Sequence, residues 1–558
     1  MTIRGSARFG SIMLALTLAL VTGPDLAQAQ QKVLRVVPHG EVKVFHPHQS
    51  QVNLISMHAA LVYDTLFSWD ADMIARPQMV ERWTVSDDKL IYSFTLRAGL
   101  KFSDGSPLTT RDVIATLKRL FVRDSQIQSL AQRVATLEAI DDTTFTLRLK
   151  EPFRFVEFLL GGSNGIAGGI MREKEAMTDP YTPITQIIGS GPFRFVKSEY
   201  RPGAKLVYEK NPFYIPRSEP ASGFSGSKLT KVDRVEFIII PDATVAIAAL
   251  RNGEVDFLDS PSLDVVPTVA NDPNIVVGEV WPIETYAVLR PNSIQPPFNN
   301  VKARLALAYM SDQREYMTSA YGDPKFWREC YAYWVCGSPN GTEVGSDDFR
   351  HPKLEKARQL IIESGYKSEK VVLIGGADVP AYNALTMVTA DRLKKIGINV
   401  DLQLSDWGSV SARRAKNRPD QGGWNLFHTS ANGAQLASPL VSPSTIMTCD
   451  GKNFVGWPCD EKEEDLRQQY IQETDPETQK ALVEAMHRRL WEVIPYVPLG
   501  QLKQPFLWRK NISGVLKANT LVFWNIEKIE RRQRNHESGK PQDHAKAAEK
   551  MTRRGAIR

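Results

Sequence analysis

The sequence lacks the short motifs that mark the common phosphate-binding and metal-dependent enzymes. Its 558 residues contain neither a GxxxxGK(S/T) loop nor an HExxH pair. Gly189-Ser-Gly191 begins like a dinucleotide fingerprint, but Pro192 follows it. Internal repeats and low-complexity segments are also missing. These absences argue against nucleotide-dependent enzymes, zinc proteases and fibrous or repeat proteins.

One catalytic pattern is present, because Gly161-Gly-Ser163-Asn-Gly165 satisfies GxSxG. A nucleophile elbow needs a buried strand before the serine and a helix after it. Glu157 interrupts the preceding apolar stretch, and Ile166-Ala-Gly-Gly169 is a poor helix start. We interpret the segment as a glycine-rich loop and expect no catalytic residues and no enzyme activity. A secreted serine hydrolase using Ser163 is the remote alternative.

No apolar run is long enough to cross a bilayer, for which about 20 residues are needed. The short apolar run from Ile12 to Val21 follows Arg4 and Arg8 and precedes Ala27-Gln28-Ala29. A basic start, a short apolar stretch and a small-x-small site are typical of secretory signal peptides. We expect residues 1–29 to be removed by cleavage after Ala29 and the mature protein to be periplasmic.

The net charge of +6 is concentrated at the ends of the chain. Residues 531–558 carry nine Lys and Arg against three Asp and Glu, and the signal segment adds a charge of +1. The remaining residues 30–530 have a net charge of −1. A neutral body gives no support to a nucleic-acid partner. The basic tail has few apolar residues and is expected to be disordered and solvated.

The chain has only four cysteines, in two closely spaced pairs. Closing a short loop costs less chain entropy than closing a long one, so an oxidising compartment favours the disulfides Cys330–Cys336 and Cys449–Cys459. A zinc site needs cysteines about two to four residues apart, which neither pair shows. We expect no bound metal and no cofactor.

Strands and helices alternate along the whole chain. The alternating segments Tyr92–Arg97 and Thr144–Leu149 predict strands of a small α+β subdomain, and Thr109 predicts a helix cap between them. Two strand–helix–strand units are predicted further on, at 235–258 and at 371–404. Their separation in the sequence indicates two α/β lobes, with a ligand between them at the carboxyl ends of the strands.

Histidines offer an alternative chemistry. His46-Pro-His48 places two imidazoles on one side of an extended segment, with His39 nearby, and imidazole suits nickel, copper or zinc. No further ligand is identifiable, so polar loop histidines are the other interpretation. Capture of nickel or of a metal chelate through His46, His48 and His428 is therefore the alternative function.

Several motifs occur along the chain in the same order as in one known protein family. The strongest block is Glu81-Arg-Trp-Thr-Val-Ser-Asp-Asp88, Tyr92-Ser-Phe-Thr-Leu-Arg97, Gly99-Leu-Lys-Phe-Ser-Asp-Gly-Ser-Pro107 and Asp112-Val113. Later matches are Gly189-Ser-Gly-Pro-Phe193, Asn211-Pro-Phe-Tyr214, Pro241-Asp-Ala-Thr244, Leu250-Arg-Asn-Gly-Glu254, Phe298-Asn299, Gly397-Ile-Asn-Val400 and Pro495-Tyr-Val-Pro498. Over residues 33–525 the chain resembles the extracytoplasmic solute-binding proteins of ABC transporters, family 5, the class that handles dipeptides, oligopeptides and nickel.

The resemblance implies an α/β fold, the two-lobed periplasmic-binding-protein fold of type II, in which the chain crosses the hinge twice. Lobe I comprises residues 30–285 and 498–530, with an extra α+β subdomain near 77–186. Lobe II comprises residues 286–497. The implied function is the substrate-binding component of an ABC importer. It captures a peptide or a peptide-sized solute by hinge closure and delivers it to the membrane permease subunits. We expect a monomer.

Dipeptide binders of this family carry an aspartate that pairs with the ammonium of the peptide. Aligned on Asn432-Gly433, that position is Ala431 here, and the tryptophan that nickel binders place near Ser430 is also missing. Amide, hydroxyl and imidazole groups suit neutral or acidic solutes, or peptides held by backbone contacts. The residues expected to line the pocket are Trp424, Asn425, His428, Thr429, Ser430, Asn432 and Gly433, with the aromatic residues Trp407, Tyr331 and Trp334.

Deleting residues 531–558 is expected to leave solute affinity unchanged, because the binding body is neutral without them. Calorimetry on the full-length and shortened proteins checks this, and a fall in affinity would show that the tail takes part in binding.

Overall fold

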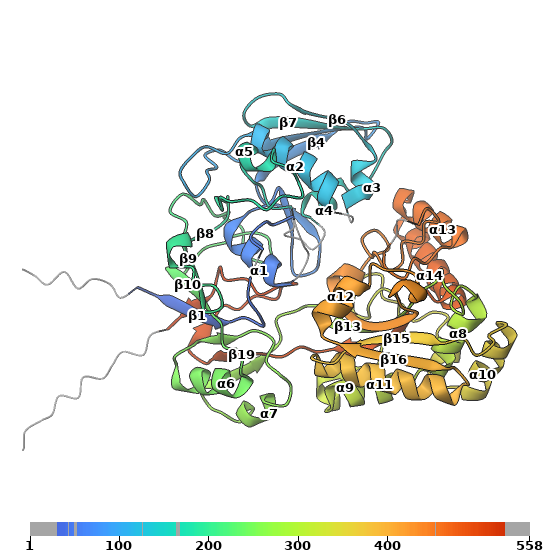
Figure 1. Cartoon of the computed structure of the whole chain (residues 1–558). Helices are drawn as coiled ribbons and strands as arrows, with labels where there is room; N and C mark the ends of the chain where they lie inside the picture. Colours follow the sequence, from blue (N-terminus) through green and yellow to red (C-terminus); the bar gives the residue numbers. More distant parts are fainter. Residues whose placement is uncertain are drawn as a thin grey trace, which may run out of the picture.

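The computed structural model describes residues 31–42, 44–48, 53–124, 127–162, 168–451 and 454–529. The expected signal segment, the basic tail and Ser163 lie outside the described residues. Figure 1 shows two lobes side by side, with a separate subdomain on top of lobe I. This arrangement confirms the expected two-lobed α/β fold.

Lobe I is built on a seven-stranded sheet with the order β12-β19-β11-β1-β10-β9-β8. Its strands are β1 (Val33–Val37), β8 (Phe193–Phe195), β9 (Lys205–Lys210), β10 (Arg234–Ile238), β11 (Phe257–Leu258), β12 (Ile275–Gly278) and β19 (Phe506–Arg509). Its helices are α1 (Asn53–Val62), α6 (Ala243–Asn252) and α7 (Val266–Val269). Strand β1 lies parallel to and between β10 and β11. The first predicted strand–helix–strand unit, β10-α6-β11, is thus confirmed, with β1 inserted between its two strands.

Sequence signals set the limits of α6. Asp242 caps the helix by accepting a hydrogen bond from the Val245 amide at 2.8 Å. Gly253 ends the helix in the left-handed region, with φ +80°, which an L side chain adopts only with strain. Helix α6 thus starts a few residues after the carboxyl end of β10.

The subdomain is a four-stranded antiparallel sheet with the order β4-β5-β7-β6. Its strands are β4 (Val80–Val85), β5 (Ile91–Leu96), β6 (Val134–Ala139) and β7 (Thr144–Leu149), and its helices are α2 (Thr110–Arg123), α3 (Gln128–Ala131), α4 (Val156–Leu160) and α5 (Glu173–Ala176). The hairpin β2 (Phe67–Trp69) and β3 (Ala75–Pro77) connects it to lobe I. As predicted, Thr109 precedes α2, and its amide donates to the Asp112 carboxylate at 2.8 Å.

Lobe II is built on a six-stranded sheet with the order β14-β18-β13-β17-β15-β16. Its strands are β13 (Thr285–Pro291), β14 (Trp327–Arg328), β15 (Val371–Gly376), β16 (Val400–Ser405), β17 (Leu426–Ala431) and β18 (Val497–Leu502). Its helices are α8 (Val301–Met310), α9 (Gln313–Tyr321), α10 (Leu354–Glu363), α11 (Pro380–Lys395), α12 (Trp407–Arg413), α13 (Glu461–Gln472) and α14 (Pro476–Val493). Helices α9 and α11 lie on one side of the sheet and α12 on the other (Figure 1). Strand β15 is parallel to β16 and to β17.

The chain passes between the lobes twice, once after β12 and once after β18. Residues 279–284 connect β12 of lobe I to β13 of lobe II, and residues 503–505 connect β18 to β19. The expected boundary at residue 498 falls inside β18, which pairs with β13 in the sheet of lobe II. The return to lobe I therefore lies after Leu502, since ladder hydrogen bonds keep β18 in lobe II.

A buried ion pair joins the segments at the base of the subdomain. The Lys228 ammonium lies 2.7 Å from the Asp64 carboxylate, and both side chains are fully buried. The Tyr214 hydroxyl donates to the same carboxylate at 2.8 Å. Burial acts to raise the pKa of Asp64, but the Lys228 charge and these hydrogen bonds outweigh it and hold the pKa below its usual value.

The variant Lys228→Met is expected to lower the free energy of unfolding by about 3–5 kcal/mol, because it leaves a buried carboxylate without its countercharge. Urea denaturation measures the change. The matched control is Lys302→Met, which removes an exposed ion pair with Glu363 and is expected to cost less than about 1 kcal/mol. Equal losses in the two variants would contradict the structural role of Lys228.

Candidate functional site

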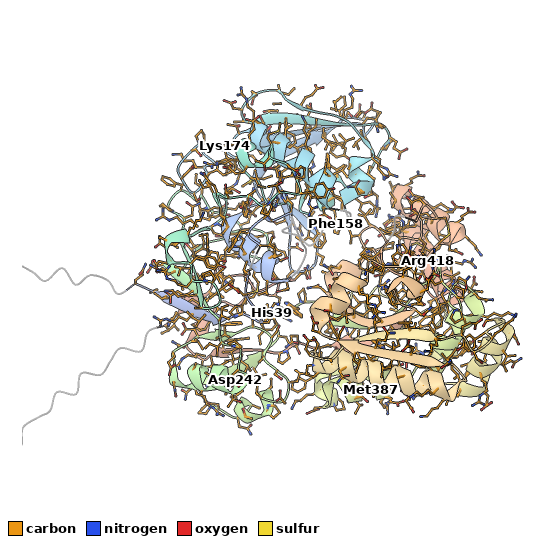
Figure 2. The ribbon with its side chains drawn as sticks, viewed as in Figure 1. His39, Phe158, Lys174, Asp242, Met387 and Arg418 are labelled. Carbon is orange, nitrogen blue, oxygen red and sulfur yellow. A yellow bond between two sulfur atoms is a disulfide. The ribbon has the colours of Figure 1, made fainter. Side chains whose placement is uncertain are left out.

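The carboxyl ends of three parallel strands form a pocket in lobe I. Loops follow β1 at Pro38, β10 at Ile239 and β11 at Asp259, and the first turns of α6 add Ala243 and Ala246. The pocket has a volume of about 370 Å³. Figure 2 places His39 on the side of lobe I that faces lobe II. Ligands of α/β proteins bind at strand ends of this kind, so this pocket is one part of the candidate site.

An ion pair supplies the charged groups of the lobe I pocket. His39 Nδ1 contacts the Asp259 carboxylate, whose side chain is 1% exposed, whereas the His39 side chain is 29% exposed. The Asp259 amide donates to the Val37 carbonyl at 2.9 Å, which fixes the loop after β11 to β1. Burial acts to lower the pKa of His39, but the Asp259 charge and hydrogen bond outweigh it and raise the pKa above its usual value.

A second pocket lies between the lobes and has a volume of about 110 Å³. Its lining residues are Trp69, Met73, Phe155 and Phe158 from the lobe I side and Pro339, Asn340, Ala434, Ala437, Ser438, Val441 and Tyr470 from lobe II. The rings of Trp69 and Phe158 stack at 4.3 Å, and those of Phe155 and Tyr470 stack at 6.0 Å across the lobe boundary. Aromatic rings of both lobes therefore enclose this space.

Three of the predicted site residues lie at strand ends of lobe II and are partly exposed. Ser430 lies near the end of β17 and shares a hydrogen bond of 2.7 Å with the Tyr382 hydroxyl. Trp407 begins α12 just after β16, with its ring 4.5 Å from that of Tyr382. The Asn432 amide donates to the Asn519 carbonyl at 3.1 Å, a contact between lobe II and the returning segment of lobe I.

The other predicted residues of the 424–433 segment are buried within lobe II. The Trp424 indole donates to the Arg414 carbonyl at 3.1 Å, and the Asn425 amide oxygen accepts from the Val372 amide at 2.8 Å. His428 shares a hydrogen bond of 2.8 Å with Thr389, and burial lowers its pKa to about 3. Thr429 is also buried, and a Cβ at Gly433 would lie 2.4 Å from the Glu284 carbonyl oxygen. In this structure these residues make their contacts inside the lobe.

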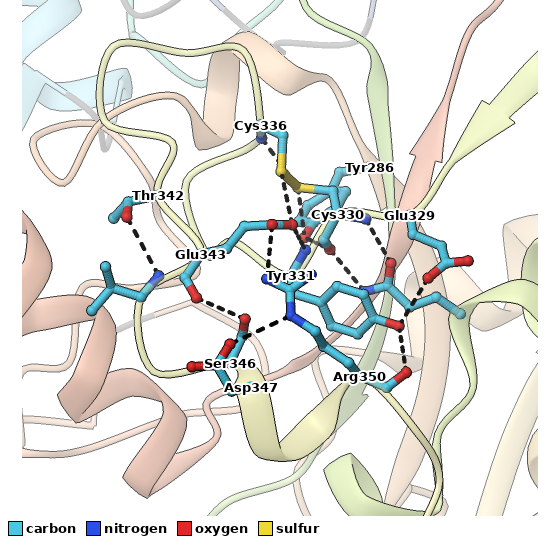
Figure 3. Close-up of polar contacts among 12 residues, drawn as sticks. Tyr286, Glu329, Cys330, Tyr331, Cys336, Thr342, Glu343, Ser346, Asp347 and Arg350 are labelled. Atoms are coloured by element: carbon cyan, nitrogen blue, oxygen red, sulfur yellow. Dashed lines mark hydrogen bonds and ion pairs between the residues drawn. A yellow bond between two sulfur atoms is a disulfide. The ribbon is translucent and has the colours of Figure 1, made fainter.

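Tyr331 and Trp334 lie in the loop closed by the Cys330–Cys336 disulfide. Figure 3 shows Tyr331 with this disulfide, Glu329 and Arg350. The Tyr331 hydroxyl donates to Glu329 at 3.3 Å and to the Arg350 carbonyl at 3.1 Å. The fully buried Trp334 donates to Thr445 at 3.2 Å and packs against His487. The structure gives neither residue a hydrogen bond or a ring contact with the 424–433 segment.

Both predicted disulfides are present in the structure. The sulfur atoms of Cys330 and Cys336 are 2.01 Å apart, and those of Cys449 and Cys459 are 1.97 Å apart. The described residues contain no free cysteine.

His46 and His48 are buried inside lobe I. Arg119 Nε donates to His46 Nε2 at 2.7 Å, and His48 Nε2 lies 3.0 Å from the Gly169 carbonyl. Burial, the largest cause, lowers the pKa of His46 to about 2 and that of His48 to about 3. Among the described residues, the cluster with metal-ligand chemistry is Cys330, Cys336 and Glu343, and its two sulfurs form the disulfide. His46 and His48 thus lie beside each other, with ring centroids 5.4 Å apart, but His428 is buried in β17 of lobe II and does not join them.

Asp259 and the aromatic residues Trp69, Phe155, Phe158 and Tyr470 are not among the site residues predicted from the sequence. A signal for Asp259 was present, since it directly follows a predicted strand of a strand–helix–strand unit, as His39 follows the strand 33–37. Both residues therefore stood where parallel strands end. The aromatic residues had no comparable signal, because the rings that stack are far apart in the sequence and Tyr470 meets Phe155 only where the lobes touch.

The variant Tyr470→Ala removes the lobe II ring of the stack with Phe155 and is expected to shift the protein toward a more open form. Such a pair contributes about 0.5–1.5 kcal/mol, up to about a tenfold change in the closed-to-open ratio. Small-angle X-ray scattering should show a larger radius of gyration. Tyr470→Phe keeps the ring and loses only the hydroxyl, with its hydrogen bonds to side chains such as Asn340, so it serves as the control. An unchanged radius in Tyr470→Ala would contradict the role of the stack.

No helix among the described residues is both long enough and apolar enough to cross a membrane. The model of the bacterial extracellular solute-binding proteins, family 5 middle region, matches residues 75–454. A probable peptide ABC transporter periplasmic-binding protein of Sinorhizobium fredii, y4tO, is 35% identical over 519 residues, which cover 91% of this chain and 97% of that protein.

Two solved structures share the fold. The binding protein AgaA of A. tumefaciens R10, in complex with agropinic acid, matches with a TM-score of 0.76 at 20% identity. The match covers 89% of this chain and 99% of the AgaA chain. The oligopeptide-binding protein AppA of Bacillus subtilis, in complex with a nonapeptide, has a TM-score of 0.74 at 19% identity, with coverages of 90% and 100%.

Proposed function

This chain belongs to the bacterial extracellular solute-binding proteins of family 5, and we propose that it captures a peptide or a peptide-sized organic solute between its two lobes. Proteins of this family are the substrate-binding components of ABC importers and are not enzymes. The two-lobed structure and the double crossing agree with capture by hinge closure.

The pocket between the lobes is the observation that carries this proposal. A solute group in this space touches Trp69 and Phe158 of lobe I and Tyr470 of lobe II at the same time. An open form cannot make both sets of contacts. Because a ligand shifts a conformational equilibrium only by its differential affinity for the two states, a pocket with walls from both lobes favours the closed form when it is filled.

In our proposal the strand ends of lobe II form the lobe II side of the solute site. Trp407, Ser430 and Asn432 are the predicted residues that retain exposed surface there, so we assign them direct contact with the solute. The buried residues Trp424, Asn425, His428, Thr429 and Gly433 then hold β17 in place, and Tyr331 and Trp334 stabilise the disulfide loop. Ala431 offers no carboxylate to a peptide ammonium, so a bound peptide is held mainly by backbone contacts, and neutral or acidic solutes also fit.

The remaining partners follow from the importer role. We assign delivery of the solute to permease subunits in the membrane by the closed form, and we take the protein to be a periplasmic monomer released by cleavage after Ala29. The neutral charge of residues 30–530 speaks against a nucleic-acid partner.

A thermal-shift screen with peptides, opines, sugars and nickel tests the proposal. A true solute at a hundred times its dissociation constant stabilises the folded state by about 2.7 kcal/mol. Stabilisation by peptides or organic solutes is the expected result. Stabilisation by nickel alone would favour the metal-binding alternative, and the absence of any stabilising solute would contradict the proposal.

Calorimetry with a solute from the screen then tests the lobe II wall. Trp407→Ala is expected to weaken binding about tenfold, the loss of one aromatic contact. The control Trp83→Ala alters a partly exposed tryptophan of β4 in the subdomain and should leave the affinity unchanged. Unchanged affinity in Trp407→Ala would remove this residue from the site.

A further inference from the structure

The lobe I pocket combines one ion pair with a lining that is mostly apolar. Its polar side chains are His39, Asp259, Ser260 and Ser262, and both serine hydroxyls donate to aspartates, Ser260 to Asp259 and Ser262 to Asp264. Only His39 and Asp259 among them titrate. The polar recognition available to a solute in this pocket therefore depends on how these two side chains are arranged.

Asp259 is not accessible to a solute. Its side chain is 1% exposed, one carboxylate oxygen contacts His39 Nδ1, and the other accepts from the Ser260 hydroxyl at 3.1 Å. The loop after β11 holds it there with Ser260 in a left-handed conformation, φ +51°, which is uncommon for a residue other than glycine. Asp259 can thus act on a solute only through His39.

His39 lines the pocket with a side chain that is 29% exposed, and one of its ring nitrogens is not engaged by Asp259. Its Nδ1 is engaged by Asp259, and the described residues provide no hydrogen-bond partner for Nε2. Burial acts to lower the pKa of the ring, but the Asp259 carboxylate raises it above its usual value. The carboxylate therefore favours the imidazolium form. In that form Nε2–H is a charged donor, and charged donors bind carboxylates more strongly than neutral acceptors.

Other charges near the pocket do not compete for this nitrogen. Asp242 lies beside the lining residues Pro241 and Ala243, where it caps α6, and Asp264 accepts from the Ser262 hydroxyl. Both carboxylates are exposed, and neither has a hydrogen bond to His39. No lysine or arginine lines the pocket.

We propose that the lobe I pocket binds the carboxylate of a solute with an apolar body, with His39 Nε2–H as the donor and Asp259 as the residue that positions the ring. The apolar lining receives the body of the solute. This inference deepens the proposed function and rests on it for the role of the interlobe cleft. It also complements the missing carboxylate at Ala431, because both walls then favour an acidic group over an ammonium.

A matched pair of small probes tests the inference. Hexanoate and hexanamide have the same apolar chain and differ in the charge of the head group. Their affinities for the full-length protein are measured by NMR titration. A charge-assisted hydrogen bond is expected to make hexanoate bind about tenfold more tightly than hexanamide. Equal affinities would overturn the proposal.

Variants assign the preference to the ion pair. His39→Gln keeps an amide donor toward Asp259 but removes the charge, so the preference for hexanoate should disappear. Asp259→Asn should reduce it, because the ring loses the partner that keeps it protonated. The control His351→Gln changes an exposed histidine of lobe II and should retain the preference. A preference that survives in His39→Gln would overturn the assignment.

The wild-type protein provides a measurement that does not depend on the folding of a variant. The preference for hexanoate should fade as the pH rises through the titration of His39, and a preference that persists at alkaline pH would overturn the proposal. Failure of the proposed function is distinguishable, because in that case no solute of the thermal-shift screen stabilises the protein even if hexanoate binds.

Discussion

The buried ion pair between Asp64 and Lys228 is the constraint on which the arrangement of lobe I depends. Asp64 follows α1 and precedes the hairpin that leads into the subdomain, and Lys228 lies in the segment before β10. Gln78, just before β4, donates to the same carboxylate at 3.3 Å, and the Lys228 ammonium lies 4.8 Å from the ring of Trp524 near the end of the described chain. One charge pair therefore fixes the start of the subdomain, the central chain and the returning segment together. Trp69 and Phe158 reach the interlobe pocket from this anchored base.

Both lobes place their candidate contact residues at the carboxyl ends of parallel strands. In each, parallel strands end at one edge of a sheet, and the candidate contacts lie at these ends or just after them. They are His39 and Asp259 in lobe I, and in lobe II Ser430 near the end of β17, Asn432 just after it and Trp407 at the start of α12. Strand interiors supply rigidity, since the buried residues of β17 bond to neighbouring strands. The side chains left for a solute are those at the strand ends or just after them.

Much of the fold could be predicted because its signals are local. The alternation of Tyr92–Arg97 corresponds to β5, and the cap at Thr109 corresponds to the start of α2. The site was harder to predict. Trp424 stands in a segment rich in polar residues, yet its ring packs against Phe427 and Trp457 on one face of the sheet while Leu426 faces the other core. Only the tertiary structure shows that both faces of β17 are covered. The contact between His39 and Asp259 likewise depends on β1 lying beside β11, a pairing of residues far apart in the sequence.

The position of the two crossings has a consequence for the history of the chain. Gly278 is the register partner of Phe506 in the sheet of lobe I, and Thr285 is the register partner of Leu502 in the sheet of lobe II. The chain therefore enters lobe II through β13 and leaves it through the neighbouring strand β18, so both ends of lobe II lie side by side. A segment whose two ends lie side by side, such as lobe II, can be exchanged between relatives without changing the strand order of the lobe I sheet. The two halves of a binding surface can in this way diversify separately while the frame that joins them is kept.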